Sequence, residues 1–438
     1  MVATKQIEVL PLYYDHVLTN EKHYDVVLLV GGRNSGKSHF MEQQTIINVN
    51  NKQDYKMVCV TGVETLVEAG IKEGLIDRID DFEYGPLFEE RKQPPKIMHQ
   101  SGNEILFKGF KSTQQQKKFK ELKKVTAIWY EEAEDLTYEQ FKALQNQLRG
   151  GKPEDRVLYL SLNPMNPDGF IDKTFFQCKP EKVFEWFEDG RPKVYEVILP
   201  VELDEGNYNI SVLVVCSTYK DNKYLTDAQK AAIVEYKDTR PDLWEMLGLC
   251  KFVYPEGTLI KELKPFSLKR MNRNSFASMK AVVDTATSGS DSATLKIYGK
   301  IDDRHHFLLE AIKSDGEADE SIRKFAEALN KFEPQRVYVE ENHEGLYFID
   351  KLDKLTKPNI FIEGFRSTEN KHEKILSQSG RIKEHLYVRD DGSDNYNECI
   401  QEVKRYNKDP KKNKHDDCID NMAMYFKHAE SDAPLEFG

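Results

Sequence analysis

The chain has no long apolar run. No stretch of its 438 residues approaches the ~20 consecutive apolar residues that are needed to cross a bilayer. The N-terminus also lacks the order of basic and then apolar residues that marks a signal peptide. We therefore expect a protein with no membrane partner that stays in the cytosol.

Cysteine is scarce. The six cysteines lie far apart, with no CxxC pair and no short spacing to histidine. Structural zinc modules need such pairs, so the sequence argues against a zinc-stabilised fold. We expect the six thiols to be free.

An excess of positive charge is also absent. The net charge of −11 argues against a protein that coats nucleic acid with its whole surface, because neutralising phosphates needs Lys and Arg. Two local runs differ, since residues 108–124 hold seven lysines and one acid, and residues 404–414 are similarly basic. A solvated helix face and a DNA-facing patch explain either run equally well.

The length and the order of elements indicate an α/β protein with two domains. A chain of 438 residues exceeds the size at which a single core stops growing. Apolar strands alternate with helical stretches before residue 165, which predicts a mostly parallel sheet covered on both faces. A second α/β pattern begins near residue 277. We predict an α/β core over 1–170, a small lid with the start of a linker over 171–255, a linker over 256–276 and a second domain over 277–438.

A phosphate-binding loop follows the first apolar strand. The segment VVLLVGGRNSGKSHF matches the pattern GxxxxGK[ST] and precedes a helical stretch, which is the context that this motif requires. Backbone N–H groups surround phosphate oxygens there, a lysine reaches the β and γ phosphates, and a hydroxyl holds Mg²⁺. We predict that ATP binds through Gly31, Asn34, Ser35, Gly36, Lys37 and Ser38.

Two acids end a later strand. The segment VTAIWYEEAEDL places Glu131 and Glu132 at the carboxyl edge of the sheet, where the phosphates would lie. We assign Glu131 to the Mg²⁺ shell and Glu132 to orienting the attacking water. The alternative is that both acids only begin a helix, where they interact well with its dipole.

Other polar or aromatic residues flank the same edge. The strand RVLYLSLNPMNP ends in Ser161 and Asn163, which would lie beside the γ phosphate and report nucleotide state to the lid. Tyr13 and Tyr14 precede the first strand, where stacking on adenine competes with a place in the core. We expect a core position for such residues more often than a base contact.

The distal half carries carboxylates at the ends of separate strands and on the last helix. Asp284 ends KAVVD, and RVYVEE ends in Glu340 and Glu341. The remaining members of this set are Asp291, Asp416, Asp417 and Asp420. Mg²⁺ prefers oxygen ligands, and two such ions can activate water and stabilise the leaving oxygen of a phosphodiester. An Asp on the first strand, a Glu on a later strand and an Asp on the last helix form the pattern expected of a ribonuclease H-like nuclease.

The order of these motifs resembles the large terminase subunit of tailed bacteriophages over nearly the whole chain. The resemblance rests on GGRNSGKS, WYEEAEDL, LSLNPMNP, STYKDNKYL, VVDTATSGSD, VYVEENHEG and HDDCID. It implies a P-loop ATPase that drives double-stranded DNA into the procapsid, and a ribonuclease H-like endonuclease that cuts concatemeric DNA. The implied cofactors are ATP and Mg²⁺, with Mn²⁺ possible at the nuclease site. The implied partners are a small terminase subunit and the portal protein, on which the motor forms a ring in the host cytoplasm.

The resemblance also assigns roles to residues. Arg33 matches the arginine that many terminases place inside the phosphate loop, and Glu132 matches the catalytic glutamate. The nuclease acids and metal ligands would be Asp284, Glu340, Asp416 and Asp417.

Three features depart from the family pattern. Glu131 stands where the family often has Asp, and its longer arm could still reach the metal through water. No arginine occurs between Arg91 and Arg149, so a cation offered to a neighbouring subunit would be Lys117, Lys118 or Arg149. The segment VTGVETL lacks the arginine that many relatives carry after the second strand.

Two other functions stay open on sequence grounds. A helicase-like or repair ATPase with an attached nuclease would separate DNA strands, although the further motifs that it needs are not found. A non-catalytic assembly scaffold would bind ATP only to order a lid. It would have no need of an acid placed to activate water.

Overall fold

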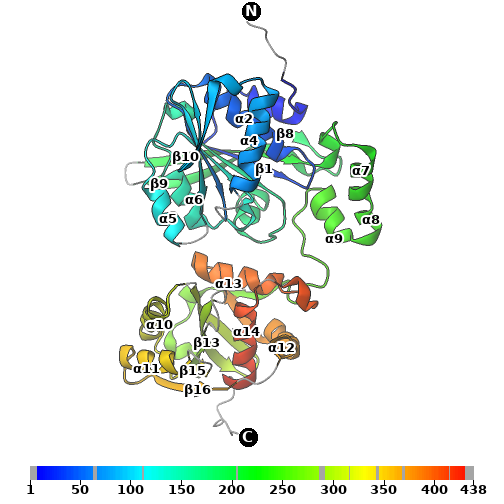
Figure 1. The fold of residues 1–438 in the computed structure, drawn as a ribbon. Coiled ribbons are helices and arrows are strands. Elements are labelled where there is room, and N and C mark those ends of the chain that lie inside the picture. Colours follow the sequence, from blue (N-terminus) through cyan, green and yellow to red (C-terminus); the bar gives the residue numbers. More distant parts are fainter. Residues whose placement is uncertain are drawn as a thin grey trace, which may run out of the picture. The chain divides into compact units, whose positions relative to one another are not determined.

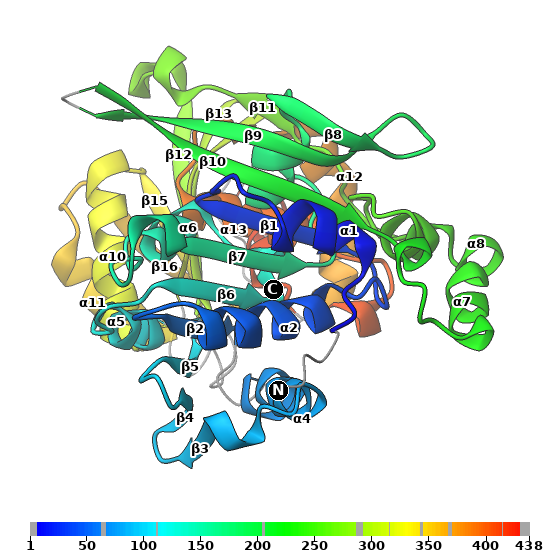
Figure 2. The ribbon, with the colours of Figure 1, turned by 90° about the horizontal axis from the view of Figure 1, so that it is seen from above.

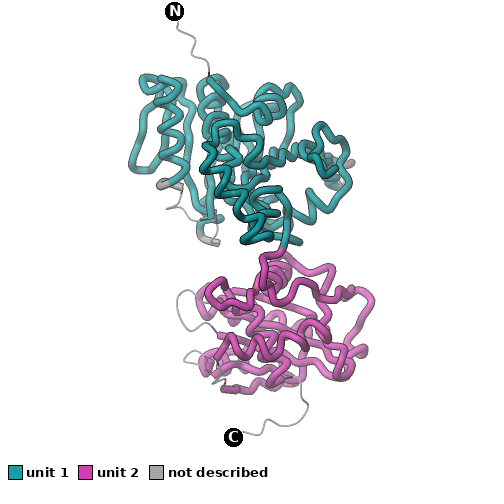
Figure 3. The backbone as a smooth tube through the Cα atoms, turned by 90° about the vertical axis from the view of Figure 1, so that its right-hand side faces the viewer, with its two compact units in different colours: residues 1–253 teal, residues 254–438 magenta. Residues whose placement is uncertain are grey.

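The computed structural model divides into two compact units. It describes residues 7–62, 67–110, 113–203, 206–285, 292–314, 316–341, 345–366, 370–413 and 415–429. Unit 1 spans residues 1–253 and unit 2 spans residues 254–438 (Figure 3). None of the helices formed by the described residues combines the length and apolar character needed to cross a membrane.

Unit 1 is built on a ten-stranded sheet in the order β3-β4-β5-β2-β6-β7-β1-β10-β9-β8. Figure 2 shows these strands in that order, from β8 and β9 at the top of the view to β3 at the bottom. The six strands from β5 to β10 in this order are parallel, and hairpins extend both edges. The bounds are β1 Val26–Gly31, β2 Lys56–Thr61, β3 Phe88–Lys92, β4 Pro95–His99, β5 Glu104–Gly109, β6 Ala127–Glu131, β7 Val157–Leu162, β8 Lys182–Trp186, β9 Pro192–Leu203 and β10 Gly206–Ser217.

The central strands are buried on both faces. Val27 and Leu29 belong to one hydrophobic cluster, while Leu28 and Val30 belong to another. Because successive side chains of a strand point to opposite faces, the sheet separates two cores, which explains why these strands are continuous apolar runs. The mostly parallel sheet predicted for this half is therefore confirmed.

Helices cover the sheet and follow its strands (Figure 1). Thr137 and Gln140 form a capping box that fixes the start of α6, and Thr226 and Gln229 do the same for α7. The bounds are α1 Pro11–Tyr13, α2 Lys37–Asn51, α4 Glu73–Asp81, α5 Thr113–Lys120, α6 Tyr138–Gln145, α7 Asp227–Val234, α8 Tyr236–Thr239 and α9 Pro241–Leu243.

The segment predicted as a lid contributes to two kinds of structure. Strands β8, β9 and β10 continue the sheet of unit 1 next to β1. A short π-helix, η6 Asp172–Phe176, precedes these strands, and the part after β10 forms α7, α8, α9 and the π-helical turn η8, Trp244–Gly248. The strands join the sheet because β10 lies parallel to β1 and is buried beside it, with Val214 opposite Leu28.

Unit 2 contains a seven-stranded sheet in the order β11-β17-β14-β13-β12-β15-β16. Strands β12, β13 and β14 form an antiparallel meander, and β15 and β16 then lie parallel to β12. This is the strand arrangement of ribonuclease H-like folds, so the fold class predicted for the distal half is confirmed. The bounds are β11 Lys264–Phe266, β12 Ser278–Asp284, β13 Ala293–Asp302, β14 His305–Ser314, β15 Arg336–Glu340, β16 Phe361–Phe365 and β17 Leu386–Arg389.

The helices of unit 2 lie on both faces of its sheet. Those after β14 are α10 Ala318–Phe332, α11 Gly345–Leu355, α12 Lys371–His385, α13 Asp394–Arg405 and α14 Asp417–Met424. Val282 and Tyr298 pack with α14 on one face, and Val283 and Leu295 pack with α10 on the other. The last apolar helix therefore packs on the sheet beside β12 and β13, as its sequence predicts.

The segment 256–276, predicted as a linker, makes several contacts within unit 2. The Leu259 N–H donates to the Tyr406 carbonyl oxygen at 2.8 Å, and Ile260 is fully buried. Strand β11 pairs with β17 in parallel. These contacts tie the segment to the unit 2 core.

Candidate functional site

The phosphate loop connects β1 to α2 with a conformation that needs glycine. Gly36 has φ +86°, in the left-handed region that side chains rarely adopt. Arg33 and Asn34 are exposed at the loop tip, and Ser35 is buried. The next residues, Lys37 and Ser38, begin α2, so its first N–H groups point toward the loop. This arrangement suits phosphate binding.

The lysine of the loop is held by the end of a neighbouring strand. Lys37 is 8% exposed, and its Nζ donates to Oδ1 of Asn163 at 3.0 Å. The Asn163 amide nitrogen in turn donates to Glu134 at 2.9 Å. Burial lowers the pKa of Lys37, and the carboxylates of Glu131 and Glu134 partly offset this effect. The hydrogen bond to Asn163 thus holds the ammonium group beside the loop.

A hydroxyl and a carboxylate meet where a nucleotide-bound Mg²⁺ would lie. Ser38 Oγ donates to Oε1 of Glu131 at 2.5 Å. The other Glu131 oxygen accepts from Trp129 Nε1 at 3.2 Å and from the Ser161 hydroxyl. Since β6 and β7 pair in parallel with Glu131 opposite Ser161, the sheet itself brings these groups together. Two oxygen donors at a phosphate loop fit the preference of Mg²⁺.

Glu132 is held differently from Glu131. Its backbone has φ +60° and ψ +48°, and its side chain is exposed. A left-handed conformation at a residue with a Cβ is strained, and such strain gathers at functional positions. The Glu132 side chain is therefore exposed at the strand end. Glu131 is instead fixed by hydrogen bonds from Ser38, Trp129 and Ser161.

Residues after β10 contact the phosphate loop from the lid side. Asn222 Nδ2 donates to the Asn34 carbonyl oxygen at 2.9 Å. Gly32 lies so close to η8 that an added Cβ would be 1.8 Å from the Leu247 carbonyl oxygen. The loop is therefore packed directly against the helical part of the predicted lid, through contacts that the sequence analysis did not identify.

The two tyrosines before β1 have different surroundings. Tyr13 is fully buried, its ring stacks on Phe40 at 4.7 Å, and its hydroxyl donates to Ser217 Oγ at 2.8 Å. Tyr14 is 48% exposed. Tyr13 is thus a core residue, and its hydroxyl also donates to the Ser35 carbonyl oxygen of the phosphate loop at 3.3 Å.

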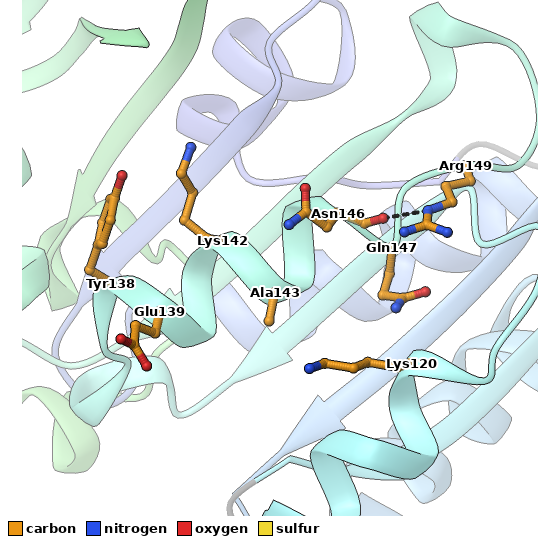
Figure 4. A pocket seen from close by; sticks show the side chains of 8 residues that line it. All are labelled: Lys120, Tyr138, Glu139, Lys142, Ala143, Asn146, Gln147 and Arg149. Atoms are coloured by element: carbon orange, nitrogen blue, oxygen red, sulfur yellow. Dashed lines mark hydrogen bonds between the residues drawn. The ribbon is translucent and has the colours of Figure 1, made fainter. Parts of the chain in front are cut away.

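A groove of about 420 Å³ lies between α5 and α6 (Figure 4). Arg149 Nε donates to the Asn146 carbonyl oxygen at 2.6 Å at one end of it. Three cations and one carboxylate line the groove, so its charge favours a phosphate-bearing or acidic ligand. Its lining residues are Lys120, Tyr138, Glu139, Lys142, Ala143, Asn146, Gln147 and Arg149.

Unit 2 brings the first two distal acids together. Strands β12 and β15 are parallel neighbours with Val283 opposite Val339, so Asp284 and Glu340 follow at the same sheet edge. The two carboxyl groups are close enough to influence each other electrostatically. Burial raises the pKa of Asp284, and Asp420 and Glu340 raise it further. Burial and the neighbouring carboxylates therefore favour the protonated form of Asp284.

The acids of the last helix lie beside this pair and are held by two lysines of α12. Lys371 Nζ lies 2.7 Å from Asp416 Oδ1 and 3.2 Å from Asp417 Oδ1. Lys374 Nζ lies 2.8 Å from Asp420 Oδ1, and both side chains are nearly fully buried. Burial raises the pKa of Asp420 to about 6, although both lysines act to lower it. The sequence does not indicate the role of these lysines, because a lysine at the start of a polar helix is usually expected to be exposed to solvent.

The remaining acids of the predicted set are placed elsewhere or lie outside the described residues. Glu341 accepts from Arg366 Nε at 3.1 Å, next to β16. Asp291 lies outside the part of the chain that the structure describes. Among the described residues, no three His, Cys, Asp or Glu side chains are arranged so that they could share a metal ion. Asp416, Asp417 and Asp420 form ion pairs with Lys371 and Lys374 instead.

Comparisons with known proteins identify the family. A model of the family described as Phage terminase large subunit matches residues 22–249, which is more than half of the chain. The PBSX phage terminase large subunit of Bacillus subtilis (strain 168) is 24% identical over 246 residues, 56% of this chain and 53% of that protein. The chain thus spans about half the length of this curated relative.

Solved structures with a similar course of the chain include two other terminases. The HK97 bacteriophage large terminase has a TM-score of 0.45 at 11% identity, covering 88% of this chain and 86% of that chain. A large terminase from a thermophilic bacteriophage has a TM-score of 0.41 at 14% identity, covering 92% of this chain and 93% of that chain. From the match of the family model, the chain belongs to the phage terminase large subunit family.

Proposed function

We propose that this protein is the motor subunit of a DNA packaging machine, with ATP hydrolysis in unit 1 and DNA cleavage in unit 2. Family membership supports the packaging role. The observation that carries the ATPase part is the meeting of Ser38 and Glu131 beside Lys37, since it supplies the cation and the oxygen donors of a P-loop hydrolase.

In the proposed hydrolysis, each residue has one task. Lys37 would leave Asn163 and bind the β and γ phosphates, and Ser38 with Glu131 would hold Mg²⁺, which neutralises charge on the phosphates. Glu132 would accept a hydrogen bond from the attacking water and orient it. Arg33 and Asn34, exposed at the loop tip, would face the nucleotide.

The test of this assignment is phosphate release from ATP in the presence of DNA. Glu132→Gln keeps the side-chain shape, so it should lower turnover about 100-fold or more while ATP binding persists. Glu154→Gln is the matched control, since Glu154 is exposed and lies in a separate 3₁₀ helix, Pro153–Asp155. Unchanged turnover in Glu132→Gln would contradict the role of Glu132. Binding without any turnover in the native protein would favour the scaffold hypothesis.

We assign a metal-dependent endonuclease to unit 2. Asp284, Glu340, Asp416 and Asp417 would be its catalytic acids and metal ligands, with Mg²⁺ or Mn²⁺, and two ions are expected from the acid pattern. The juxtaposition of Asp284 and Glu340 with the acids of α14 supports this proposal. Asp420 lies in the same group and is a further candidate.

Plasmid cleavage tests the nuclease. Supercoiled DNA incubated with Mn²⁺ should be cut by the native protein and not by Asp284→Ala. Asp353→Ala is the control, because Asp353 is exposed on α11. Equal cutting by native protein and Asp284→Ala would remove the nuclease assignment.

The partners and the place of action are proposed from the family. Double-stranded DNA would be the translocated substrate, a small terminase subunit would select it, and a ring on the portal would form in the host cytoplasm, with a monomer possible in isolation. A ring would also let one copy offer Lys117, Lys118 or Arg149 to its neighbour's nucleotide. Arg149 lines the positive groove, and both lysines are exposed on α5. DNA protected from nuclease inside procapsids, in the presence of ATP, measures translocation directly.

A strand-displacement assay separates this proposal from a helicase-like or repair ATPase. A packaging motor moves along intact duplex, so the protein should release no labelled strand from a partial duplex while it hydrolyses ATP. ATP-dependent release of the strand would instead support the helicase hypothesis.

A further inference from the structure

The first lysine of α12 lies among the acids of the proposed nuclease. Its ammonium group is 2.7 Å from Asp416, 3.2 Å from Asp417 and 3.8 Å from Asp420. Asp284 acts on the same ammonium group electrostatically. Lys371 therefore lies within ion-pair distance of three carboxylates at the start of α14.

The two α12 lysines differ in how easily their ammonium groups could move away from the carboxylates. Lys374 is 3% exposed and pairs with Asp420, which is 4% exposed, so separating them would bury an uncompensated charge. Lys371 is 38% exposed and Asp416 is 35% exposed. Lys371 is also the first residue of α12, where a long side chain can turn toward solvent without disturbing the helix. Lys371 is thus the displaceable cation of the pair.

An ammonium group and a divalent ion bind the same carboxylate oxygens and cannot occupy the same space. Lys371 Nζ lies within 4 Å of carboxylate oxygens of Asp416, Asp417 and Asp420, which are oxygens that a divalent ion would use. We propose that Lys371 competes with the metal for Asp416, Asp417 and Asp420, so that metal entry displaces its ammonium group and the lysine-bound arrangement is an inactive state. This inference rests on the proposed nuclease function and adds its regulation.

The competition has a thermodynamic consequence that can be measured without cleavage. A metal that must displace an ion pair binds more weakly than it would to the same acids without the lysine. Removing the ammonium group should therefore raise metal affinity, even if the same change lowers the cutting rate.

Isothermal titration of the full chain with Mn²⁺ tests this directly. Lys371→Met should bind Mn²⁺ more tightly than native protein by about tenfold. Lys371→Arg keeps the cation and should stay near the native affinity. Lys383→Met, on the same helix but exposed and far along it, is the matched control and should change nothing. Equal or weaker Mn²⁺ binding by Lys371→Met would overturn the proposal.

Thermal unfolding supplies a second readout. Without cation, Lys371→Met leaves the acids unneutralised, so its Tm in EDTA should fall and its rise with Mn²⁺ should exceed that of native protein. If Lys371→Met shows no cooperative transition, Lys371→Gln, which keeps a polar side chain, replaces it in both measurements. Equal Mn²⁺-induced rises would count against the proposal.

Asp284→Ala distinguishes failure of this inference from failure of the nuclease assignment. Loss of Mn²⁺ binding in Asp284→Ala, together with native affinity in Lys371→Met, would overturn only the competition. Mn²⁺ binding that survives Asp284→Ala would place the metal elsewhere and would overturn both.

Discussion

Glu42 on α2 carries a half-buried carboxyl group that interacts electrostatically with Glu131. Burial raises its pKa to about 7, Arg78 lowers it, and Glu131 and Asp77 raise it further. The folded protein therefore holds a proton on Glu42 between pH ~4.5 and ~7, where the unfolded chain does not. Stability from this group is fully present below the unfolded pKa and is lost as pH rises through the folded pKa.

Glu42→Gln should remove that dependence, because glutamine is neutral at every pH. Between pH 5 and 8, native protein should lose on the order of 2 kcal/mol more unfolding free energy than Glu42→Gln does. Urea unfolding at both pH values measures the difference. Glu154→Gln, an exposed site, should behave as the native protein does. Parallel pH profiles for native protein and Glu42→Gln would contradict the buried-acid explanation.

Asn163 gives a second prediction at the scale of single residues. Its side-chain oxygen accepts a hydrogen bond from the buried Lys37 ammonium. Asn163→Ala should cost about 1–3 kcal/mol, because that donor is left unpaired. A non-hydrolysable ATP analogue supplies new acceptors, so it should raise the Tm of Asn163→Ala more than that of native protein. Asn222→Ala, which loses hydrogen bonds to the Asn34 carbonyl oxygen and from the Tyr224 N–H but none to Lys37, should show the native rise.

At the scale of elements, sequence patterns predict buried strands well and exposed strands poorly. Strands β1 and β7 are buried at every position, so they appear as continuous apolar runs. Strand β3, FEERK, is mostly exposed, and β8 alternates between exposed and half-buried positions. Such edge strands form because a neighbouring strand pairs with them. Their own amino-acid composition resembles that of a loop, so it does not indicate a strand. Local composition therefore does not predict β3, β4, β8 or β11.

The candidate sites also combine features that local sequence predicts with features that depend on which elements are neighbours. The position of Glu131 at a strand end follows from one segment, so the sequence predicts it. The approach of Asp284 to Glu340 depends on which strands are neighbours, which local patterns do not determine. The ion pairs of Lys371 need α12 and α14 to meet, so no local signal indicates them.

The contact between the phosphate loop and η8 leads to a prediction at this scale. Gly32→Ala would place a Cβ against the Leu247 backbone, which cannot yield as a flexible side chain would. We expect a loss of about 1–3 kcal/mol in unfolding free energy and weaker ATP binding, because the loop must shift. Gly70→Ala is the control, since an added Cβ there meets open space. Native stability and ATP affinity in Gly32→Ala would show that the two elements are not tightly packed.

At the scale of the whole molecule, each unit has its own hydrophobic clusters. The clusters around Leu29 and Leu28 belong to unit 1, and those around Val282 and Val283 belong to unit 2. Because each unit encloses its own cores, each is expected to fold when produced alone. The sequence predicts this division into two parts, although it does not indicate where the chain between them attaches.

The start of unit 2 decides how stable that unit will be alone. A fragment of residues 254–438 keeps the fully buried Ile260, the Leu259–Tyr406 hydrogen bond and the pairing of β11 with β17. A fragment of residues 277–438 loses all three and exposes the edge of β17. Loss of one buried isoleucine alone costs about 2–5 kcal/mol, so the shorter fragment should unfold at a clearly lower temperature or fail to fold. Thermal unfolding of both fragments measures this, and equal Tm values would mean that residues 254–276 add no stability to the unit 2 core.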